Sequence, residues 1–203
     1  MTQLPQKLKE RAARKTAKRD DKKRQMADST IAALKELGYA NTTLRDIAQK
    51  SDLSLGMLHY YFEDKSDLIV FCVERYKQAF IDNMIAAVAE ARNREQVIAL
   101  LSGALATAIS DDGATHRLWY DIRTQAMFDR SFAPVVAEIE AAMIEVLAGA
   151  YSRAGLAVPQ DIAVGYASLD GVSRYFIQRQ GGPQADGRDD MQAVFAAMLA
   201  RMM

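Results

Sequence analysis

The distribution of proline constrains the fold of this chain more than any other sequence feature. The 203 residues contain four prolines, at positions 5, 134, 159 and 183. Because proline interrupts the interior of a helix, the long proline-free stretches between them permit long helices. Apolar residues in these stretches recur every three or four positions, and no convincing run alternates apolar with polar residues as a half-buried strand would. Half of the residues are hydrophobic, which is ample for a core. We therefore predict an all-α fold of about nine helices.

Two short helices joined by a tight turn are predicted in the first third of the chain. Thr43 is a natural N-cap, with Asp46 three positions later as in a capping box, and Ser54 caps a second helix over about residues 55–61. The turn SDLS joins the two helices, and each has a thin apolar side. Together they form a helix-turn-helix, whose second helix enters the major groove of DNA.

The second of these helices carries side chains that a core rarely accommodates together. In the stretch SLGMLHYYF, Leu58 and Phe62 are predicted to face inward, which leaves several of the other side chains exposed. Tyrosine and histidine can hydrogen-bond to phosphates, glycine lets a backbone approach closely, and helix N-termini favour phosphate groups. We therefore expect DNA contacts from Thr42, Thr43, Arg45, Ser54, Leu55, Gly56, Met57, His59, Tyr60, Tyr61 and Lys65.

Basic residues are concentrated at the N-terminus of a chain that is neutral as a whole. Residues 1–24 contain ten Lys and Arg against three acidic residues, so the rest of the chain carries a net charge of −7. Residues 1–19 are predicted to be a flexible basic arm that lies along the DNA backbone or in the minor groove. A solvated tail without a partner is the alternative interpretation.

Residue types that carry enzymatic chemistry are sparse. The two histidines, His59 and His116, are far apart in sequence, and a single cysteine, Cys72, can form neither an internal disulfide nor a zinc site with a second cysteine. No GxGxxG or Walker-type loop is present. We predict that the protein is not an enzyme and has no metal site or cofactor. Cys72 is expected to be a small buried apolar side chain, and His116 a surface or hydrogen-bonded helix histidine.

The sequence also predicts where the protein resides. It has no uninterrupted run of 18 or more apolar residues, so no membrane span and no membrane partner are expected. The N-terminus is charged from Lys7 onward and lacks the hydrophobic region of a signal peptide. Together with the single cysteine, these features predict a cytoplasmic protein.

The stretch TTLRDIAQKSDLSLGMLHYYFEDKSDL closely resembles the DNA-binding head of TetR-family transcriptional regulators. The resemblance spans about residues 22–70. Where the family commonly has Tyr-Tyr-His-Phe or Tyr-x-His-Phe, this chain has His59-Tyr60-Tyr61-Phe62, so Tyr60 keeps its place while His59 and Tyr61 depart from the pattern. The positions that match the family pattern are Thr43, Ile47, Ala48, Ser54, Gly56, Leu58, Phe62, Lys65 and Leu68.

Two C-terminal stretches, RLWYDIRTQAMFDRSFAPVV and ASLDGVSRYFIQRQG, are similar to BetI-type regulators, a choline-responsive branch of the family, but this similarity does not transfer the ligand. The resemblance implies a DNA-binding head at residues 20–66 and an effector-binding and dimerisation body at residues 67–203. Helices are predicted at about residues 20–37, 55–61, 65–91, 94–110, 114–129, 133–155, 160–179 and 188–202, with a further short helix after Thr43 that buries Leu44, Ile47 and Ala48.

A two-fold dimer made by the last two helices is also implied by the resemblance. Such a dimer suits a palindromic operator, because two recognition helices must reach successive major grooves. The expected interface residues are Ile162, Tyr166, Leu169, Phe176, Met191, Val194, Phe195, Met198 and Leu199.

A ligand pocket inside the body is the second feature that the resemblance implies. The candidates mix apolar side chains with a few polar anchors, as pockets do. They are Phe80, Met84, Trp119, Tyr120, Arg123, Met127, Phe128, Tyr166, Asp170 and Tyr175. Trp119 can bind a cationic ligand by cation–π contact, with Asp121 or Asp170 assisting. The alternative is that these side chains fill the core.

These features predict a homodimeric transcriptional repressor that leaves a palindromic operator in double-stranded DNA when an unknown small molecule binds. Other interpretations remain open. The protein can be a DNA-binding regulator without a small-molecule effector, or an activator. It can also be a helical enzyme or carrier that uses the body cavity.

Overall fold

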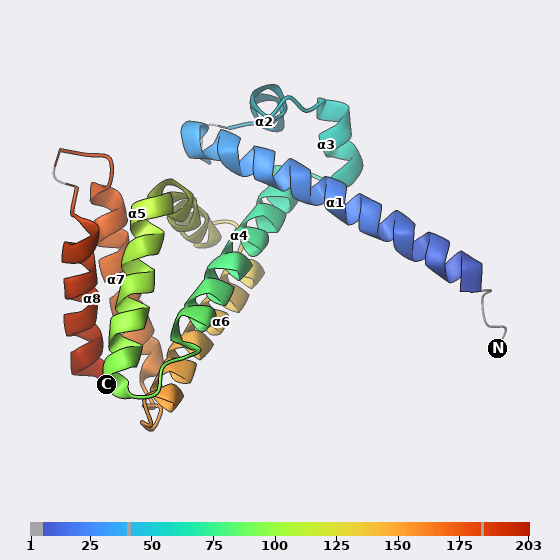
Figure 1. The fold of residues 1–203 in the computed structure, drawn as a ribbon. Helices are drawn as coiled ribbons and strands as arrows, with labels where there is room; N and C mark the ends of the chain where they lie inside the picture. Colours follow the sequence, from blue (N-terminus) through green and yellow to red (C-terminus); the bar gives the residue numbers. More distant parts are fainter. Residues whose placement is uncertain (1–5, 40–41, 184) are drawn as a thin grey trace. The chain divides into compact units, whose positions relative to one another are not determined.

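Eight α-helices and no β-strand make up the residues that the computed structural model describes, which are 6–39, 42–183 and 185–203 (Figure 1). For residues 6–13 and 15 the backbone alone is described. The predicted all-α class is confirmed. The chain divides into two compact units, Met1–Cys72 and Val73–Met203, and the division lies within α4 (Lys65–Val88). The boundary predicted after residue 66 lies near this division.

The N-terminal unit contains α1 (Gln6–Leu37), α2 (Leu44–Lys50) and α3 (Leu55–Tyr61), with α2 packed against the other two. Gly38 ends α1 in the left-handed region at φ +74°, where its N–H bonds to the Leu34 carbonyl at 2.9 Å. Glycine adopts this backbone conformation without strain. The buried core of the unit consists of Met26, Ala27, Ala33, Leu34, Ile47, Ala48, Leu58, Phe62, Leu68, Ile69 and Cys72.

The first helix begins earlier than predicted. It begins at Gln6 instead of near residue 20, so residues 6–19 are helical where a flexible arm was expected. The stretch QKLKERAARKTAKR contains neither glycine nor proline and is rich in Ala, Lys, Arg and Gln, which are strong helix formers. High charge density does not prevent helix formation in such a sequence. Residues 1–5 of the predicted arm lie outside the described residues.

The C-terminal unit is built around α5 (Arg94–Ala126), which packs against α6 (Ala133–Arg153), α7 (Ile162–Arg179) and α8 (Arg188–Met202) (Figure 1). The helices predicted over 94–110 and 114–129 both lie within α5 and meet there without a loop, so the described residues form eight helices and not nine. Asp112, at φ −141° and ψ 35°, makes a kink close to the predicted break. The helix continues past Gly113, and the Thr115 hydroxyl donates to the Asp112 carboxylate at 2.6 Å.

By length and composition alone, α5 is apolar enough to cross a membrane, although no uninterrupted apolar run marks it in the sequence. Charged residues such as Asp111 and Arg117 lie on its surface, and its buried face includes Leu101, Ile109 and Ile122. The same composition is found in the central helix of a soluble helical bundle. Its contacts with α6, α7 and α8 therefore account for its hydrophobicity.

Most of the predicted dimer-interface residues are buried inside the chain itself. Met191, Phe195 and Leu199 of α8 have no exposed surface, and Leu169 and Phe176 of α7 are also buried. These side chains pack in the core around α5, so they do not form part of the exposed surface of the described residues. Ile162, Tyr166 and Met198 are half-buried, and Val194 is exposed.

Candidate functional site

Each helix of the helix-turn-helix begins at a side-chain cap. The Thr43 hydroxyl accepts from the Asp46 N–H at 3.2 Å, and the Asp46 carboxylate accepts from the Thr43 N–H at 2.8 Å. Hydrogen bonds from the Thr43 hydroxyl and backbone lower the pKa of Asp46. The Ser54 hydroxyl accepts from the Met57 N–H at 3.1 Å. The predicted capping box and second cap are confirmed, and they set where α2 and α3 begin.

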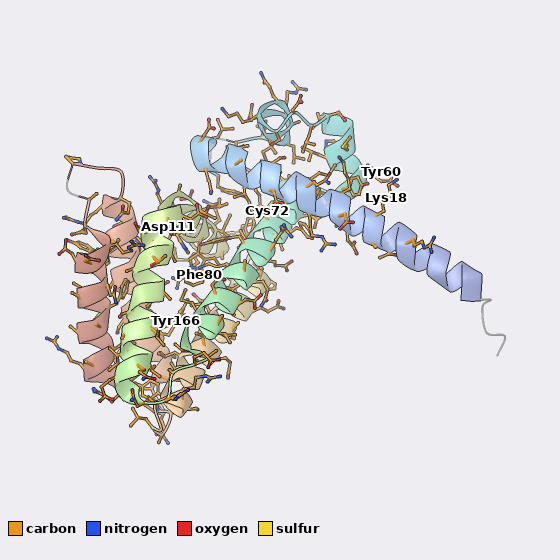
Figure 2. The ribbon with its side chains drawn as sticks, viewed as in Figure 1. Lys18, Tyr60, Cys72, Phe80, Asp111 and Tyr166 are labelled. Carbon is orange, nitrogen blue, oxygen red and sulfur yellow. The ribbon has the colours of Figure 1, made fainter. Side chains whose placement is uncertain are left out.

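Helix α3 buries one side and exposes the other. Leu58 and Phe62 face the core of the unit, as predicted. His59 is exposed, and the Tyr60 side chain, labelled in Figure 2, is 72% exposed. The Tyr61 ring contacts the Tyr60 ring edge to face, with the ring centres 5.0 Å apart. The polar-tipped aromatic side chains therefore form a surface and not a core.

Gly56 is exposed on α3 and does not adopt a positive φ. A Cβ atom placed there would meet no other atom within 4 Å. The fold of the N-terminal unit therefore does not require glycine at this position. The remaining surface candidates are Thr43, Arg45 and Ser54, which are exposed, and Leu55 and Met57, which are half-buried.

Two predicted DNA contacts, Thr42 and Lys65, make hydrogen bonds inside the unit. Thr42 is buried, and its hydroxyl donates to the Gly38 carbonyl, so the expectation that it binds DNA is corrected. The Lys65 ammonium donates to the Tyr39 carbonyl at 2.7 Å and lies 4.0 Å from the centre of the Tyr39 ring. Burial lowers the pKa of Lys65, while the charge of Asp46 acts in the opposite direction. Lys65 thus holds the loop after α1 with one of its three N–H donors.

The C-terminal unit encloses a cavity of about 70 Å³. Helices α4, α5, α6 and α7 line it, and Figure 2 shows two lining residues, Phe80 on α4 and Tyr166 on α7. Its wall is mostly aliphatic, with a few polar groups, as is usual for a ligand site. Of the predicted pocket residues, the structure brings together Phe80, Met84, Trp119, Tyr120, Tyr166 and Asp170.

Three predicted pocket residues lie elsewhere. The side chains of Met127, Phe128 and Tyr175 are 71%, 84% and 53% exposed, and none of them lines this cavity. Met127 instead lines a more open pocket of about 690 Å³ together with Tyr120, Arg123 and Asp170. Met127 and Phe128 follow the last residue of α5, where the chain leaves the bundle. The sequence does not show whether an aromatic or methionine side chain near the end of a helix points toward the cavity or toward solvent, because this depends on where the helix ends.

Lys77 and His116 line the cavity but were not predicted as pocket residues. The Lys77 side chain is 4% exposed, and its ammonium lies 4.4 Å from the centre of the Trp119 ring and 4.9 Å from that of Phe80. Burial lowers the pKa of Lys77 to about 7, although the charge of Asp170 partly opposes this. His116 is buried, and its Nδ1 shares a hydrogen bond with the Tyr76 hydroxyl, as expected for a hydrogen-bonded helix histidine.

A sequence signal for Lys77 does exist. It lies on the apolar stripe Val73, Lys77, Phe80, Met84 of α4, and every other cation from residue 73 onward is an arginine. A charged residue on an apolar stripe predicts a buried charge, which is rare without a function or a partner. The other residues of this stripe have the spacing of ordinary core residues, so the position of Lys77 does not stand out in the sequence.

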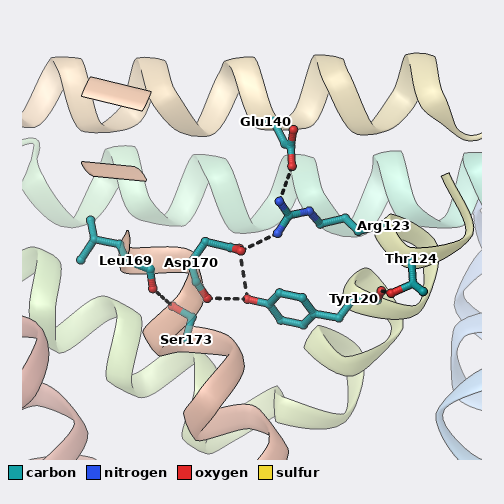
Figure 3. Close-up of polar contacts among 7 residues, drawn as sticks. All are labelled: Tyr120, Arg123, Thr124, Glu140, Leu169, Asp170 and Ser173. Atoms are coloured by element: carbon teal, nitrogen blue, oxygen red, sulfur yellow. Dashed lines mark hydrogen bonds and ion pairs between the residues drawn. The ribbon is translucent and has the colours of Figure 1, made fainter. Parts of the chain in front are cut away.

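Polar residues beside the cavity form a network that joins three helices (Figure 3). Arg123 of α5 forms ion pairs with Asp170 of α7 and, at 2.5 Å, with Glu140 of α6. The Tyr120 hydroxyl donates to the Asp170 carboxylate at 3.1 Å. Burial opposes the charge on Arg123, but the two carboxylates outweigh it and raise the pKa of Arg123. Arg123 therefore holds Asp170 at the cavity wall without lining the cavity itself.

Comparison with known proteins agrees with this architecture. Residues 28–70 match the family described as "Bacterial regulatory proteins, tetR family". The HTH-type transcriptional regulator BetI of Burkholderia thailandensis is 34% identical over 55 residues, which are 27% of this chain and 28% of that protein. BetI of Cronobacter sakazakii is 24% identical over 113 residues, which are 52% of this chain and 54% of that protein. The matched part thus spans about half or less of these relatives, and the similarity supports the BetI branch only weakly.

Solved structures share the fold over most of the chain. A TetR transcription regulator from Haloarcula marismortui has a TM-score of 0.72 at 21% identity, covering 91% of this chain and 98% of its own. The transcriptional regulator FadR from Bacillus subtilis, in complex with stearoyl-CoA, has a TM-score of 0.69 at 16% identity, covering 87% and 95%.

The expectation that the chain is not an enzyme agrees with these matches, which are to regulatory proteins. The capped helix-turn-helix lies within the residues that the family description matches, and the helical fold continues through the C-terminal unit. Residues 28–70 of this protein therefore match the tetR family of bacterial regulatory proteins, and the described residues share the all-α fold of solved regulators.

Proposed function

We propose that this protein is a DNA-binding transcriptional regulator whose recognition helix is α3. The observation that carries the proposal is the outward face of α3, where His59 and Tyr60 are exposed while Leu58 and Phe62 form the core. Exposed tyrosine and histidine on the second helix of a helix-turn-helix suit contacts with base edges and phosphates. Gly56, which the fold does not require, leaves the backbone open to close approach.

The basic half of α1 supplies a further DNA contact in this proposal. Arg14, Lys18 and Arg19 are exposed on a helix that begins at Gln6. Each phosphate that they neutralise releases a counterion, which makes affinity depend on salt. Removing residues 1–19 is expected to weaken binding and to flatten the dependence of affinity on salt. An unchanged slope would exclude this role.

A homodimer formed by α7 and α8 is the proposed assembly. The exposed face of α7 carries Val164, Ser168, Gly171 and Tyr175 at helical spacing, and that of α8 carries Ala193, Val194, Ala197 and Ala200. These faces are mostly apolar or small, with the exposed charges Arg174 on α7 and Asp190 and Arg201 on α8 beside them, and such surfaces often pack against another surface. Their exposed residues replace the buried ones predicted from sequence. A two-fold dimer presents two copies of α3 to a palindromic operator.

We propose that a small molecule bound in the cavity releases the protein from its operator, so that it acts as a repressor in the cytoplasm. Helix α4 supports this coupling, because it lines the cavity and also continues into the N-terminal unit. The ligand must bind the DNA-free state more tightly, and coupling free energies of about 1–3 kcal/mol are typical. FadR, which shares the fold, was solved in complex with stearoyl-CoA, so this architecture accommodates a ligand in at least one regulator.

The experiment that tests DNA binding is selection of duplexes from a random library with the purified full-length protein at near-physiological salt. Enrichment of a palindrome with half-sites about one helical turn apart, or a multiple of it, is expected. Failure to enrich any sequence with folded, dimeric protein would overturn the proposal.

A matched pair of variants sharpens this experiment. Arg45→Gln removes an exposed positive charge from α2, and Arg117→Gln removes one from the surface of α5. Arg45→Gln should weaken DNA binding and reduce the slope of log affinity against log salt by about one, because it loses one phosphate contact. Arg117→Gln should change neither quantity. Equal effects of the two variants would mean that α2 does not contact the DNA.

A regulator without a small-molecule effector is the second candidate, and the size of the cavity favours it. Pockets for drug-sized ligands are about 300–1,000 Å³, whereas this cavity is about 70 Å³. Release of operator DNA by a ligand that occupies the cavity would exclude this candidate. Operator binding that no cavity ligand alters would favour it.

A further inference from the structure

Lys77 is a buried cation that faces the cavity without an anionic partner. Its side chain is 4% exposed and lines the cavity among apolar side chains. Among the residues that the structure describes, Lys77 forms no ion pair or hydrogen bond, and its near contacts are the rings of Tyr76, Phe80 and Trp119. Buried charges are ordinarily paired, because an unpaired charge is costly to remove from water. Lys77 therefore lacks the counterion that its position calls for.

Asp170, the acidic residue that lines the cavity, already pairs with other side chains. Asp170 lines the cavity, but its carboxylate accepts from Tyr120 at 3.1 Å and forms an ion pair with Arg123. Arg123 is in turn shared with Glu140 at 2.5 Å. Asp170 thus acts on Lys77 only through its charge at a distance. We therefore infer that an anion in direct contact with Lys77 would have to come from a bound ligand.

A cationic ligand does not fit the same cavity. The Trp119 ring, predicted from sequence to bind a cation, already has the Lys77 ammonium at 4.4 Å and the Arg123 guanidinium at 5.7 Å from its centre. A quaternary ammonium group placed against this ring would meet two positive charges in a mostly apolar site. Repulsion is strong where the local dielectric is low.

We propose that the cavity binds a small monoanionic carboxylate, whose charged group pairs with Lys77 while its apolar part contacts Phe80, Trp119 and the aliphatic wall. This assignment names the ligand class of the effector site, and its regulatory meaning rests on the function proposed above. A phosphate ester fits less well, because its second charge and extra oxygens need more donors than one ammonium. The volume of about 70 Å³ suits a short acid.

Affinity for such an anion depends on whether Lys77 is protonated. The titratable groups around it are Tyr76 on α4, then His116, Tyr120 and Arg123 on α5, and Tyr166 and Asp170 on α7, while Glu140 on α6 pairs with Arg123. Burial raises the pKa of each of these three tyrosines, so they stay neutral, and the pKa of Arg123 is raised, so it stays charged. With a pKa of about 7 for Lys77, anion binding above pH 7 requires proton uptake and weakens as pH rises.

The test is a fluorescence titration of the full-length protein without DNA, read from Trp119, the single tryptophan of the chain. The probes are butyrate, hexanoate and octanoate, with hexanamide, hexyltrimethylammonium and hexyl phosphate as matched alternatives. At least one acid is expected to saturate the signal and to bind about tenfold or more tightly than hexanamide, since a charge-assisted contact is lost in the amide. From pH 6.0 to 8.5 its affinity should fall by about 10- to 30-fold, given a pKa near 7 for free Lys77.

Four variants separate the charge of Lys77 from other effects. Lys77→Met keeps the length of the side chain without its charge and should abolish both the preference for the acid and its pH dependence. Lys77→Arg should retain the preference, and Arg117→Met, which removes an exposed charge from α5, should change neither. A His116→Gln variant that keeps the pH dependence confirms that Lys77 is the titrating group.

Several results would overturn the inference. They are acid binding unchanged in Lys77→Met, tighter binding of the amide, ammonium or phosphate probe, and no saturable binding of any acid by the folded protein. Selection of DNA duplexes with the same protein preparation distinguishes failure of this ligand assignment from failure of the proposed DNA-binding function. Operator binding without acid binding would overturn only the ligand assignment, whereas acid binding without any selected operator would overturn only the DNA-binding role.

Discussion

The ammonium nitrogen of Lys77 lies 4.4 Å from the centre of the Trp119 ring, and both side chains are almost fully buried in the C-terminal unit. This contact places a titratable charge against the only tryptophan of the chain. Because the pKa of Lys77 is lowered to about 7 by burial, the charge beside the indole changes near neutral pH. The emission of Trp119 is thus a direct reporter of the cavity.

Trp119 emission is expected to titrate with a midpoint at about pH 7, because protonation of Lys77 changes the electric field at the ring. Emission spectra between pH 5.5 and 9 check this. The transition should vanish in Lys77→Met and persist in His116→Gln. A titration that survives in Lys77→Met would assign it to another group.

Lys77→Met is expected to stabilise the protein below pH 7 and to have less effect near pH 10. Lys77 has a folded-state pKa of about 7 against 10.5 for the free side chain, so between these values the unfolded chain binds more protons. Wild-type stability should therefore rise with pH through this window, and the cost of charging buried Lys77 is complete below pH 7. The gain in the variant should be on the order of 2–5 kcal/mol at pH 6.5.

Urea unfolding of wild type and Lys77→Met at pH 6.5 and 9.5 measures this difference. Lys77→Arg is the control, because arginine stays charged throughout the range. If the difference in the free energy of unfolding between wild type and Lys77→Met were the same at both pH values, it would contradict the lowered pKa of Lys77.

Gly56→Ala is expected to separate folding from DNA binding. Alanine is favoured over glycine in a helix by about 1 kcal/mol, and a Cβ atom at this position meets nothing within 4 Å, so the variant should be at least as stable as wild type. If the DNA backbone or bases approach α3 closely at Gly56, affinity for the selected operator should fall by about tenfold or more. Thermal unfolding and operator titration of the same preparation provide the two readouts, and unchanged affinity would place the DNA elsewhere.

Thr30→Val should stabilise the N-terminal unit. The Thr30 hydroxyl oxygen is fully buried in α1 and has no hydrogen-bond partner among the described residues. An unsatisfied buried polar group costs about 1–3 kcal/mol, and valine has nearly the same shape, so a gain of roughly 1 kcal/mol is expected. Chemical denaturation checks it, with Thr43→Ala as a contrast that should lose about 1 kcal/mol because it removes the cap of α2. Destabilisation by Thr30→Val would mean that the hydroxyl is satisfied in solution.

Much of the N-terminal unit was predictable because its signals are local. The cap formed by Thr43 and Asp46, the cap formed by Ser54, and the positive φ of Gly38 each involve residues within four positions of one another. Inward Leu58 and Phe62 followed from helical spacing alone. The contacts of Thr42 and Lys65 were not predicted, because their partners, Gly38 and Tyr39, belong to the loop after α1, whose path the helix pattern does not describe.

The sequence by itself determined the helices, the helix-turn-helix and the outward face of α3, since period and capping are set by neighbouring residues. Only the tertiary structure decided which apolar residues of α7 and α8 are core, because a helix with apolar residues on several sides can bury any of them. It also decided that Lys77 faces a cavity while Met127 and Phe128 face solvent. Burial and the counterions of a charge depend on segments far apart in sequence, and packing alone brings those segments together.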